Sequence, residues 1–510
     1  MLTNRKVLYL IFPAIIVQLF HSIFAMITYD EVNFLSIATR NSGLFGDFSV
    51  ENFEGFGMIF WFLYMIIIRT TIFITQDHEK FVFINQGFEH TRFLDYTDFL
   101  DTPHLTLIFM RSFAAGALLL FLAKFMLYIG NLHKETESKG IKLWNFGILL
   151  AFSISPLFAW SGKLASPEYF ATFFCGIAAI FTLEKKPLKA LVWMSIAFSF
   201  KISATPVIVG LLFVILVESV RQNSRKFCLR DSVVLAFNQL KRPFAIVLIL
   251  NPILIYDTRS FLGNLPIRNS ALGQFSGINW ENEIKTTLFT NFQTWDLVSI
   301  NGFLYWGGWF LVPLALVSWL IQKRFCIRLT FLAISSFILL IGGVSFYPWY
   351  QFPLVCTLFV FATLDPKLIK QSQALLAKTK ATVGSALVMT LALGSTSNGY
   401  KEFQISWNWN KDRISTQTSA CDLTTPEDSQ LLDLALISKS VRSETTSFYT
   451  NNSNLDEFYR NDKEHITLIL GAVSTEKYLE LSEQNGYGII EKNQLCGSIN
   501  IYKLQLENEN

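Results

Sequence analysis

Long apolar segments recur along this chain and restrict the folds that it can adopt. The first begins at Val7 and ends at the acidic pair Asp30 and Glu31, and later runs lie at about residues 104–131, 144–160, 169–183, 188–200, 203–219, 243–257, 302–321, 329–345, 350–364 and 382–395. A helix needs about 20 apolar residues to cross a bilayer. With 51% hydrophobic residues, the pattern predicts an α-helical polytopic membrane protein.

Basic residues gather in alternate connections between these runs, which predicts an orientation. Arg5 and Lys6 precede the first run, so we expect a cytoplasmic N-terminus. The later basic clusters are Lys134, Lys139 and Lys142; Lys185, Lys186 and Lys189; Arg221, Arg225, Lys226, Arg230, Lys241 and Arg242; Lys323, Arg324 and Arg328; and Lys367, Lys370, Lys378 and Lys380. The connections between them are poorer in Lys and Arg and are expected outside.

The apolar block from Phe56 to Ile74 does not fit this alternation as a spanning helix. If it crossed the membrane without a return, every later basic cluster would lie outside, against the positive-inside rule. We therefore expect it to lie along the outer interface or to re-enter, within a large first outer loop from residue 30 to 103. That leaves about eleven spanning helices and places the C-terminus outside.

The composition changes after Leu393, which predicts two domains. Residues 1–395 form the transmembrane part, and residues 396–510 read as a small α/β domain on the outer face. Strands are expected at Ile466–Leu470 and Ile499–Leu504, and a helix around Leu431–Val441.

The cysteines and histidines predict no metal site. Cys175 and Cys356 fall in expected spanning helices, and Cys228 and Cys326 in cytoplasmic loops. Cys421 and Cys496 share the outer domain, where a disulfide between them and two free thiols are both consistent with the sequence. The 6 His show no metal-ligand spacing.

Charged residues at the expected outer helix ends are the candidates for chemistry. Carboxylates beside cations at one membrane face suit transfer of a group from a lipid-linked phosphate, because cations hold the phosphate while a carboxylate accepts a proton. The alternative for each residue is structural: an acidic flank, a helix cap, or a cation that reaches the interface. The candidates are Asp30, Glu31, Arg111, Lys163, Glu168 and Lys201.

Several of these segments resemble GT-C fold glycosyltransferases, the group that contains protein O-mannosyltransferases and the lipid A aminoarabinose transferase. Tyr29–Ala38 resembles the Asp-Glu signature that follows the first helix of that group. Weaker similarities are Met110–Ser112 with Gly116, the acidic loop Ser161–Phe170, the Lys-bearing turn Phe200–Ser203, and the aromatic stretch Phe346–Tyr350, with Tyr347 and Tyr350 as substrate-binding candidates. The first outer loop and the acidic loop depart from the group's pattern at Asn52–Gly57, Ser166 and Glu168.

The resemblance implies an inverting glycosyltransferase that acts in the cell envelope. A polyprenyl-phosphate sugar would be the donor, and a glycan, lipid or protein the acceptor, in a bacterial inner membrane; no nucleic acid is expected as a partner. Asp30 would act as the base, and Glu31 would orient substrate or help bind a divalent cation if one is used. Arg111, Lys163, Glu168 and Lys201 would bind substrate. A polysaccharide polymerase or ligase, or a transporter or flippase, remains an alternative.

Overall fold

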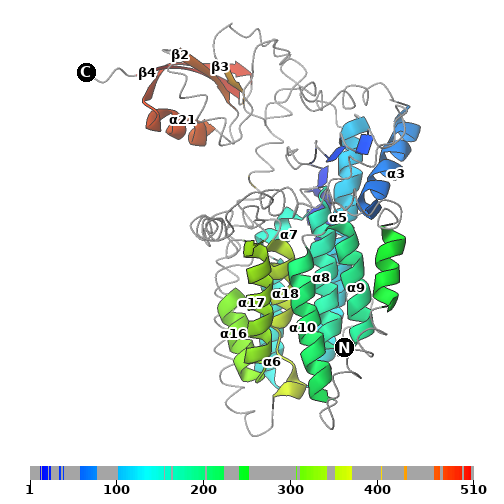
Figure 1. Cartoon of the computed structure of the whole chain (residues 1–510). Coiled ribbons are helices and arrows are strands. Elements are labelled where there is room, and N and C mark those ends of the chain that lie inside the picture. Colours follow the sequence, from blue (N-terminus) through cyan, green and yellow to red (C-terminus); the bar gives the residue numbers. More distant parts are fainter. Residues whose placement is uncertain are drawn as a thin grey trace, which may run out of the picture.

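The computed structural model is a bundle of apolar helices together with a small β-sheet (Figure 1). The structure describes residues 12, 14–20, 22, 23, 31, 34, 35, 38, 39, 58–76, 102–153, 155–161, 165–201, 204–222, 241–251, 306, 311–341, 351–369, 404, 430–432, 465–470, 475–496 and 499–506. Asp30, Lys163, Tyr347, Tyr350, Cys421 and the run at 382–395 lie outside these residues.

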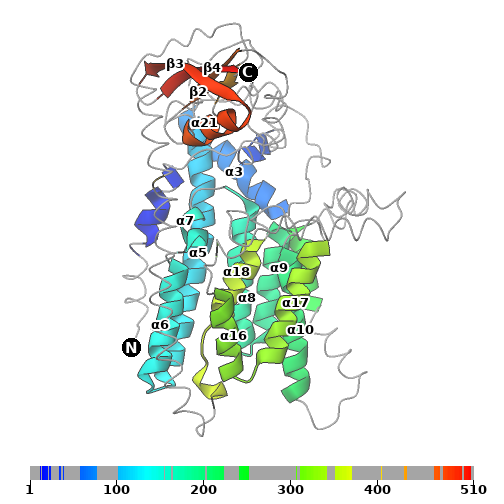
Figure 2. The same cartoon turned by 90° about the vertical axis from the view of Figure 1, so that its left-hand side faces the viewer.

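The bundle consists of helices that pass back and forth beside one another. In chain order they are α5 (Thr102–Lys134), α6 (Lys139–Ser153), α7 (Pro156–Trp160), α8 (Pro167–Leu183), α9 (Pro187–Phe200), α10 (Thr205–Gln222), α16 (Leu311–Ile321), α17 (Phe325–Ile341) and α18 (Phe352–Phe361). A further helix covers residues 241–250. Figure 2 shows α5 and α6 at one side of the bundle and α10 and α17 at the other.

The apolar runs of the sequence correspond closely to these helices, which confirms most of the expected positions. One run, 144–160, was wrong as a single helix, since it divides between α6 and α7. The break has a local cause: the Ser155 hydroxyl caps α7 by accepting a hydrogen bond from the Phe158 amide, and Pro156 occupies the first turn. Proline has no N–H to donate to α6, so the earlier helix cannot continue through it.

Helix α3 (Met58–Thr75) corresponds to the apolar block whose membrane placement the sequence left open. It lies obliquely near the end of the bundle where α5 begins (Figure 1, Figure 2). Phe60, Trp61 and Tyr64 are fully buried, whereas Ile66 and Phe73 on the other face are 62% and 76% exposed. An apolar buried face and an apolar exposed face together suit a helix packed between the bundle and lipid.

Helix α18 ends in a set of side-chain hydrogen bonds that lock it to its neighbours. The last carbonyls of a helix have no partner within the helix. Here the carbonyl of Phe361, the last helical residue, accepts hydrogen bonds from Trp319 and Arg328. The carbonyls that follow the helix accept from Trp144 at Ala362, from Ser318 and Gln322 at Thr363, and from Asn145 at Leu364. The donors come from α6, α16 and α17, so this end of the bundle is rigidly joined.

Among the described residues, one helix is long and apolar enough to cross a membrane. It is Leu105–Lys134, 30 residues with a mean hydropathy of 2.0, and the bundle also contains shorter apolar helices of 10 to 17 residues. The count of about eleven spans stays a prediction.

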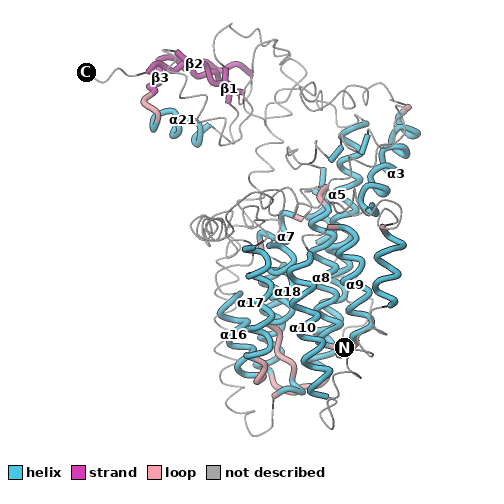
Figure 3. Tube along the Cα trace, in the orientation of Figure 1, coloured by secondary structure: helices cyan, strands magenta, loops and turns pink. Residues whose placement is uncertain are grey.

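The C-terminal part contains a sheet of strand order β1-β2-β4-β3 (Figure 3). The strands are β1 (Gln430–Leu432), β2 (His465–Leu470), β3 (Tyr487–Cys496) and β4 (Ile499–Leu506), and α21 (Thr475–Gln484) precedes β3. β1 and β2 are parallel, whereas β4 pairs with β2 and β3 in antiparallel fashion. The strands expected at 466–470 and 499–504 are confirmed. The helix expected around Leu431 is wrong at that residue, which lies in β1.

Candidate functional site

A buried ion pair joins the acidic signature to α5. Arg111 donates from Nε to Glu31 Oε1 at 2.7 Å and from Nη2 to Glu31 Oε2 at 2.6 Å, and neither side chain is exposed. Nη1 donates to the carbonyl of Ser22 at 3.3 Å, and the amide of Ala165 donates to Glu31 Oε1 at 2.7 Å. Such a two-pronged arrangement fits the planar guanidinium to the planar carboxylate. Four separate chain segments therefore meet at one charge pair.

A second buried ion pair joins the start of α8 to the end of α9. Lys201 Nζ lies 2.9 Å from Glu168 Oε1, and the two side chains are 5% and 3% exposed. The Ser166 hydroxyl donates to the other oxygen of Glu168 and also caps α8. Glu168 lies in the first turn of α8, where the aligned backbone amides favour a negative charge.

The loop between α7 and α8 brings the two pairs together. Ala165, which contacts Glu31, is three residues before Glu168. At the other end of the loop, Gln18 donates to the Phe158 carbonyl at 2.8 Å and accepts from the Ser161 hydroxyl at 3.3 Å. Residues of the first apolar run thus hold both ends of the acidic loop.

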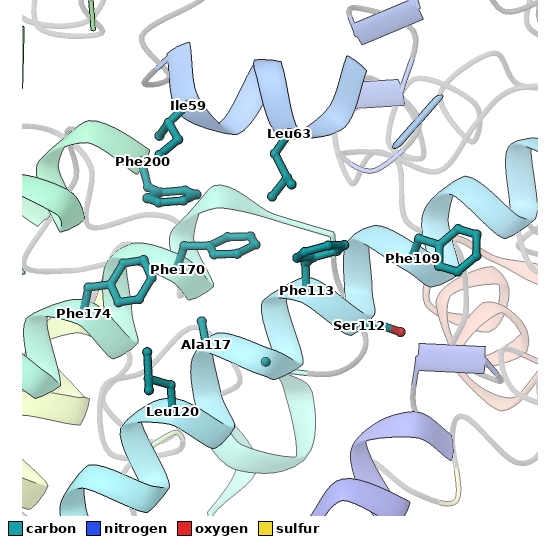
Figure 4. Close-up of a pocket in the computed structure, with 11 residues that line it drawn as sticks. Ile59, Leu63, Phe109, Ser112, Phe113, Ala117, Leu120, Phe170, Phe174 and Phe200 are labelled. Atoms are coloured by element: carbon teal, nitrogen blue, oxygen red, sulfur yellow. The ribbon is translucent and has the colours of Figure 1, made fainter. Parts of the chain in front are cut away.

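An apolar groove of about 530 Å³ lies between α3, α5, α8 and α9 (Figure 4). Ile59 and Leu63 of α3 form one wall, and the α5 residues Phe109 to Leu120 form another. The lining residues are Ile59, Leu63, Phe109, Ser112, Phe113, Gly116, Ala117, Leu120, Phe170, Phe174 and Phe200. The rings of Phe170 and Phe200 are stacked, with centroids 4.6 Å apart.

Several residues that line the groove are close in sequence to the residues of the two ion pairs. Phe200 directly precedes Lys201, Ser112 directly follows Arg111, and Phe170 is two residues after Glu168. Ser112 is the polar member of the lining, and its hydroxyl donates to the Ile108 carbonyl of its own helix. The surface therefore suits a hydrocarbon chain whose charged end lies near the two pairs.

The structure brings four of the predicted site residues together. Glu31, Arg111, Glu168 and Lys201 form the two pairs, which confirms the prediction that carboxylates lie beside cations. The roles assigned to them stay predictions. Asp30 lies outside the described residues but is joined directly to Glu31, and Lys163, Tyr347 and Tyr350 also lie outside.

Sequence reasoning missed the residues that complete the site. Ala165 acts through its backbone amide and Ser22 through its carbonyl, so neither side chain carries a signal. Ser166 carried one, because Ser-Pro-Glu is a typical helix start. The phenylalanines of the groove could not be told from lipid-facing residues by their pattern.

No described group of three or more His, Cys, Asp or Glu side chains could hold a metal ion. Glu31, predicted to help bind a divalent cation if one is used, has both oxygens engaged by Arg111. Because Arg111 occupies both carboxylate oxygens, Glu31 is not arranged to bind a metal ion. No step of the proposed reaction therefore involves a metal.

Comparison with known proteins gives distant structural likeness alone. No protein-family model matches the sequence, and no curated protein matches it. The solved structures that match include crystal structures of ArnT from Cupriavidus metallidurans, one bound to undecaprenyl phosphate and one in the apo state. Each has a TM-score of 0.41 and 10% sequence identity, and each alignment covers 97% of this chain and 97% of the other.

These structural neighbours are aminoarabinose transferases of the GT-C type, the group that the sequence resembles. At this TM-score and identity, the likeness carries no information on the reaction or its substrates.

Proposed function

We propose that this chain is an integral membrane glycosyltransferase that moves a sugar from a polyprenyl-phosphate donor to an acceptor at the outer face of the plasma membrane. The observation that carries the proposal is the apolar groove with two buried ion pairs beside it. A lipid phosphate has the same two parts, a hydrocarbon chain and a charged head. Few soluble substrates would use both.

The bundle has the surface expected of a protein surrounded by lipid. Large apolar side chains face outward along several helices, including Phe113, Phe146, Leu216, Ile249 and Phe337, which are 50% to 75% exposed. A soluble protein rarely exposes so many on adjoining helices. The support for a membrane location is therefore the outward face of the bundle as well as the length of α5.

Charged residues mark two levels along α8 that match the thickness of a bilayer. Glu168 pairs with Lys201 at its start, and Glu184 at its end pairs with Lys124 and Lys186. The two carboxylates are separated along the helix by about 24 Å, close to the hydrocarbon thickness of about 30 Å. The end of α8 at Glu184 leads into one of the basic connections, which favours the cytoplasmic side for this end of the helix. The start of α8 and the groove would then lie toward the outer side.

The proposed reaction is a direct displacement at the anomeric carbon of the donor sugar. Asp30 takes the proton of the acceptor hydroxyl, and the resulting oxygen attacks the anomeric carbon. The bond between that carbon and the phosphate oxygen breaks, and its electron pair remains on the phosphate. Displacement from the opposite side inverts the anomeric configuration.

Lys201 is the residue that we assign to the donor phosphate. Phe200, which directly precedes it, lines the groove. Its carboxylate partner Glu168 has the Ser166 hydroxyl and the first turn of α8 to stabilise it when the ammonium turns to another anion. The ammonium would stabilise the charge that remains on the phosphate as the bond breaks. Glu168 and Lys163, on the same loop, remain candidates for acceptor binding.

The test is transfer of labelled sugar from polyprenyl-phosphate donors, with wild type and Asp30→Asn compared at matched expression. We expect transfer to fall by about 10²- to 10⁴-fold, the contribution typical of a general base. Glu137→Gln, which removes an exposed carboxylate in the connection between α5 and α6, is the matched control and should leave transfer unchanged.

Other outcomes would replace the proposal. Unchanged transfer by Asp30→Asn would remove Asp30 as the base. Absence of transfer by wild type from every donor, with uptake of lipid-linked sugar into vesicles instead, would favour a transporter. Extension of a glycan chain from the labelled donor would favour a polysaccharide polymerase.

A further inference from the structure

The Glu31–Arg111 pair has no exposed surface, whereas the side chains of Lys201 and Glu168 are 5% and 3% exposed. Each of the three guanidinium nitrogens of Arg111 donates a hydrogen bond, two to Glu31 and one to the Ser22 carbonyl. Both side chains have no exposed surface. These hydrogen bonds use three of the five N–H groups, and because neither side chain is exposed, a phosphate could reach the guanidinium only if the residues that bury it moved aside.

Separation would leave Glu31 buried without its charged partner. The Ala165 amide would stay with it, but a neutral amide does not replace a cation, and a buried carboxylate that has lost its charged partner is strongly unfavourable. Glu168 differs, because the Ser166 hydroxyl and the first turn of α8 remain with it when Lys201 turns away. The two pairs therefore suit different tasks.

We infer that Glu31 and Arg111 are positioning residues: a fixed internal pair that holds the chain at residue 31 against Ala165 and α5 and does not touch the donor. This inference rests on the proposed function, in which Asp30 is the base. The carboxylate of Asp30 needs a fixed place relative to the groove, and Glu31, the residue that follows it, is anchored to Arg111 and to the Ala165 amide. The pair would thus act on the reaction through the backbone of its neighbour.

The pair also explains why the acidic signature has two members with unequal roles. Glu31 contacts α5 through Arg111 and the acidic loop through Ala165, so one side chain connects α5 to the acidic loop. Replacing both partners by neutral residues of similar size should preserve the packing, whereas removing one should not.

The test compares Arg111→Met with the double variant Glu31→Gln/Arg111→Met. After Glu31→Gln the side chain still offers an oxygen to the Ala165 amide, and methionine fills the space of the arginine stem. Three quantities are measured: melting temperature in detergent, hydrogen exchange of the peptide that contains Ala165, and binding of radiolabelled polyprenyl phosphate. Lys139→Met removes an exposed cation at the start of α6 and serves as the control.

We expect Arg111→Met alone to lower the melting temperature and to speed exchange at Ala165 by tenfold or more, on the order of the loss of one buried charge partner. The double variant should recover both, and should bind polyprenyl phosphate within about threefold of wild type because the lost groups do not contact it. The transfer rate of Arg111→Met should fall while its KM for donor stays unchanged, and the double variant should recover most of that rate.

Two results would overturn the inference. If the double variant keeps its melting temperature and its Ala165 protection but binds polyprenyl phosphate more than about tenfold more weakly, Arg111 is a donor ligand. If Arg111→Met leaves exchange at Ala165 unchanged, the pair does not hold the loop. Wild type that binds no polyprenyl phosphate would defeat the proposed function, while the exchange measurement would still decide whether the pair positions the loop.

Discussion

At the scale of single residues, the site contrasts two buried ion pairs that the sequence could not tell apart. Lys201 has a compact ammonium on a flexible stem, whereas Arg111 is fixed in a planar fork. A lysine can change partners by rotating its side chain. A guanidinium held by three hydrogen bonds cannot do so without breaking them.

Lys201→Met is expected to destabilise the protein by less than the ~3–5 kcal/mol typical of a broken buried ion pair, because the Ser166 hydroxyl and the first turn of α8 stay with the Glu168 carboxylate. Adding Glu168→Gln should restore the melting temperature. Binding of polyprenyl phosphate should nevertheless remain lost in this double variant, since the cation for the phosphate is absent. Melting in detergent and binding of the radiolabelled lipid check both parts.

The double variant of the Glu31–Arg111 pair is the comparison for this prediction. Neutralising that pair should preserve lipid binding, and neutralising the Glu168–Lys201 pair should abolish it. If both double variants bind the lipid as wild type does, neither pair holds the donor phosphate. If both lose binding, both pairs hold it.

At the scale of helices, α8 is the element around which the site is built. It carries Glu168 at its start, contributes Phe170 and Phe174 to the groove, and packs against α5, α9 and α18. Its close approach to two of these neighbours depends on Gly176. A Cβ at that position would lie 2.6 Å from Phe121 of α5 and 2.7 Å from Cys356 of α18.

Gly176→Ala is therefore expected to destabilise the bundle by about 1–3 kcal/mol through overpacking. Gly116→Ala in α5 is a matched control, because a Cβ there meets nothing within 4 Å. Both changes gain about 1 kcal/mol of helix propensity, so the difference between them isolates the packing. Melting temperatures of the two variants that fall equally would contradict the close contact at Gly176.

The helices could be predicted from the sequence far better than the site could. Apolar runs located α5, α8, α9 and α17 because burial in a bundle and contact with lipid both demand apolar residues. The break at Ser155–Pro156 was also encoded, by a cap and a proline. β1 was missed because a short strand such as Gln430–Leu432 has too few residues to show a period.

The site could be predicted only in part because its contacts join distant segments. Charge at helix ends selected Glu31, Arg111, Glu168 and Lys201. Which carboxylate meets which cation depends on tertiary packing, since Glu31 and Arg111 are 80 residues apart. The groove left no signal at all, because its phenylalanines come from three helices and each alone resembles a residue that faces lipid.

At the scale of the whole molecule, the proposal requires one orientation in the membrane. The groove and both ion pairs must lie at the outer face, where Asp30 would meet an acceptor. The connections with Lys186, Arg324 and Lys367 would then face the cytoplasm. Cys326 lies in the first turn of α17, close to Arg324, and its side chain is exposed. It is a natural reporter of this face.

A variant with Cys228, Cys421 and Cys496 changed to serine leaves Cys326 together with the buried Cys175 and Cys356. A membrane-impermeant maleimide should label it in inverted vesicles and not in sealed vesicles of native orientation, because the reagent reaches only the face exposed to it. Labelling in both preparations after lysis is the control for reactivity, and Cys326→Ser shows that the signal belongs to this thiol. If only sealed vesicles of native orientation are labelled, the molecule has the opposite orientation and the groove lies on the cytoplasmic side. The reaction would then not take place at the outer face, even if Asp30 and Lys201 were shown to act as proposed.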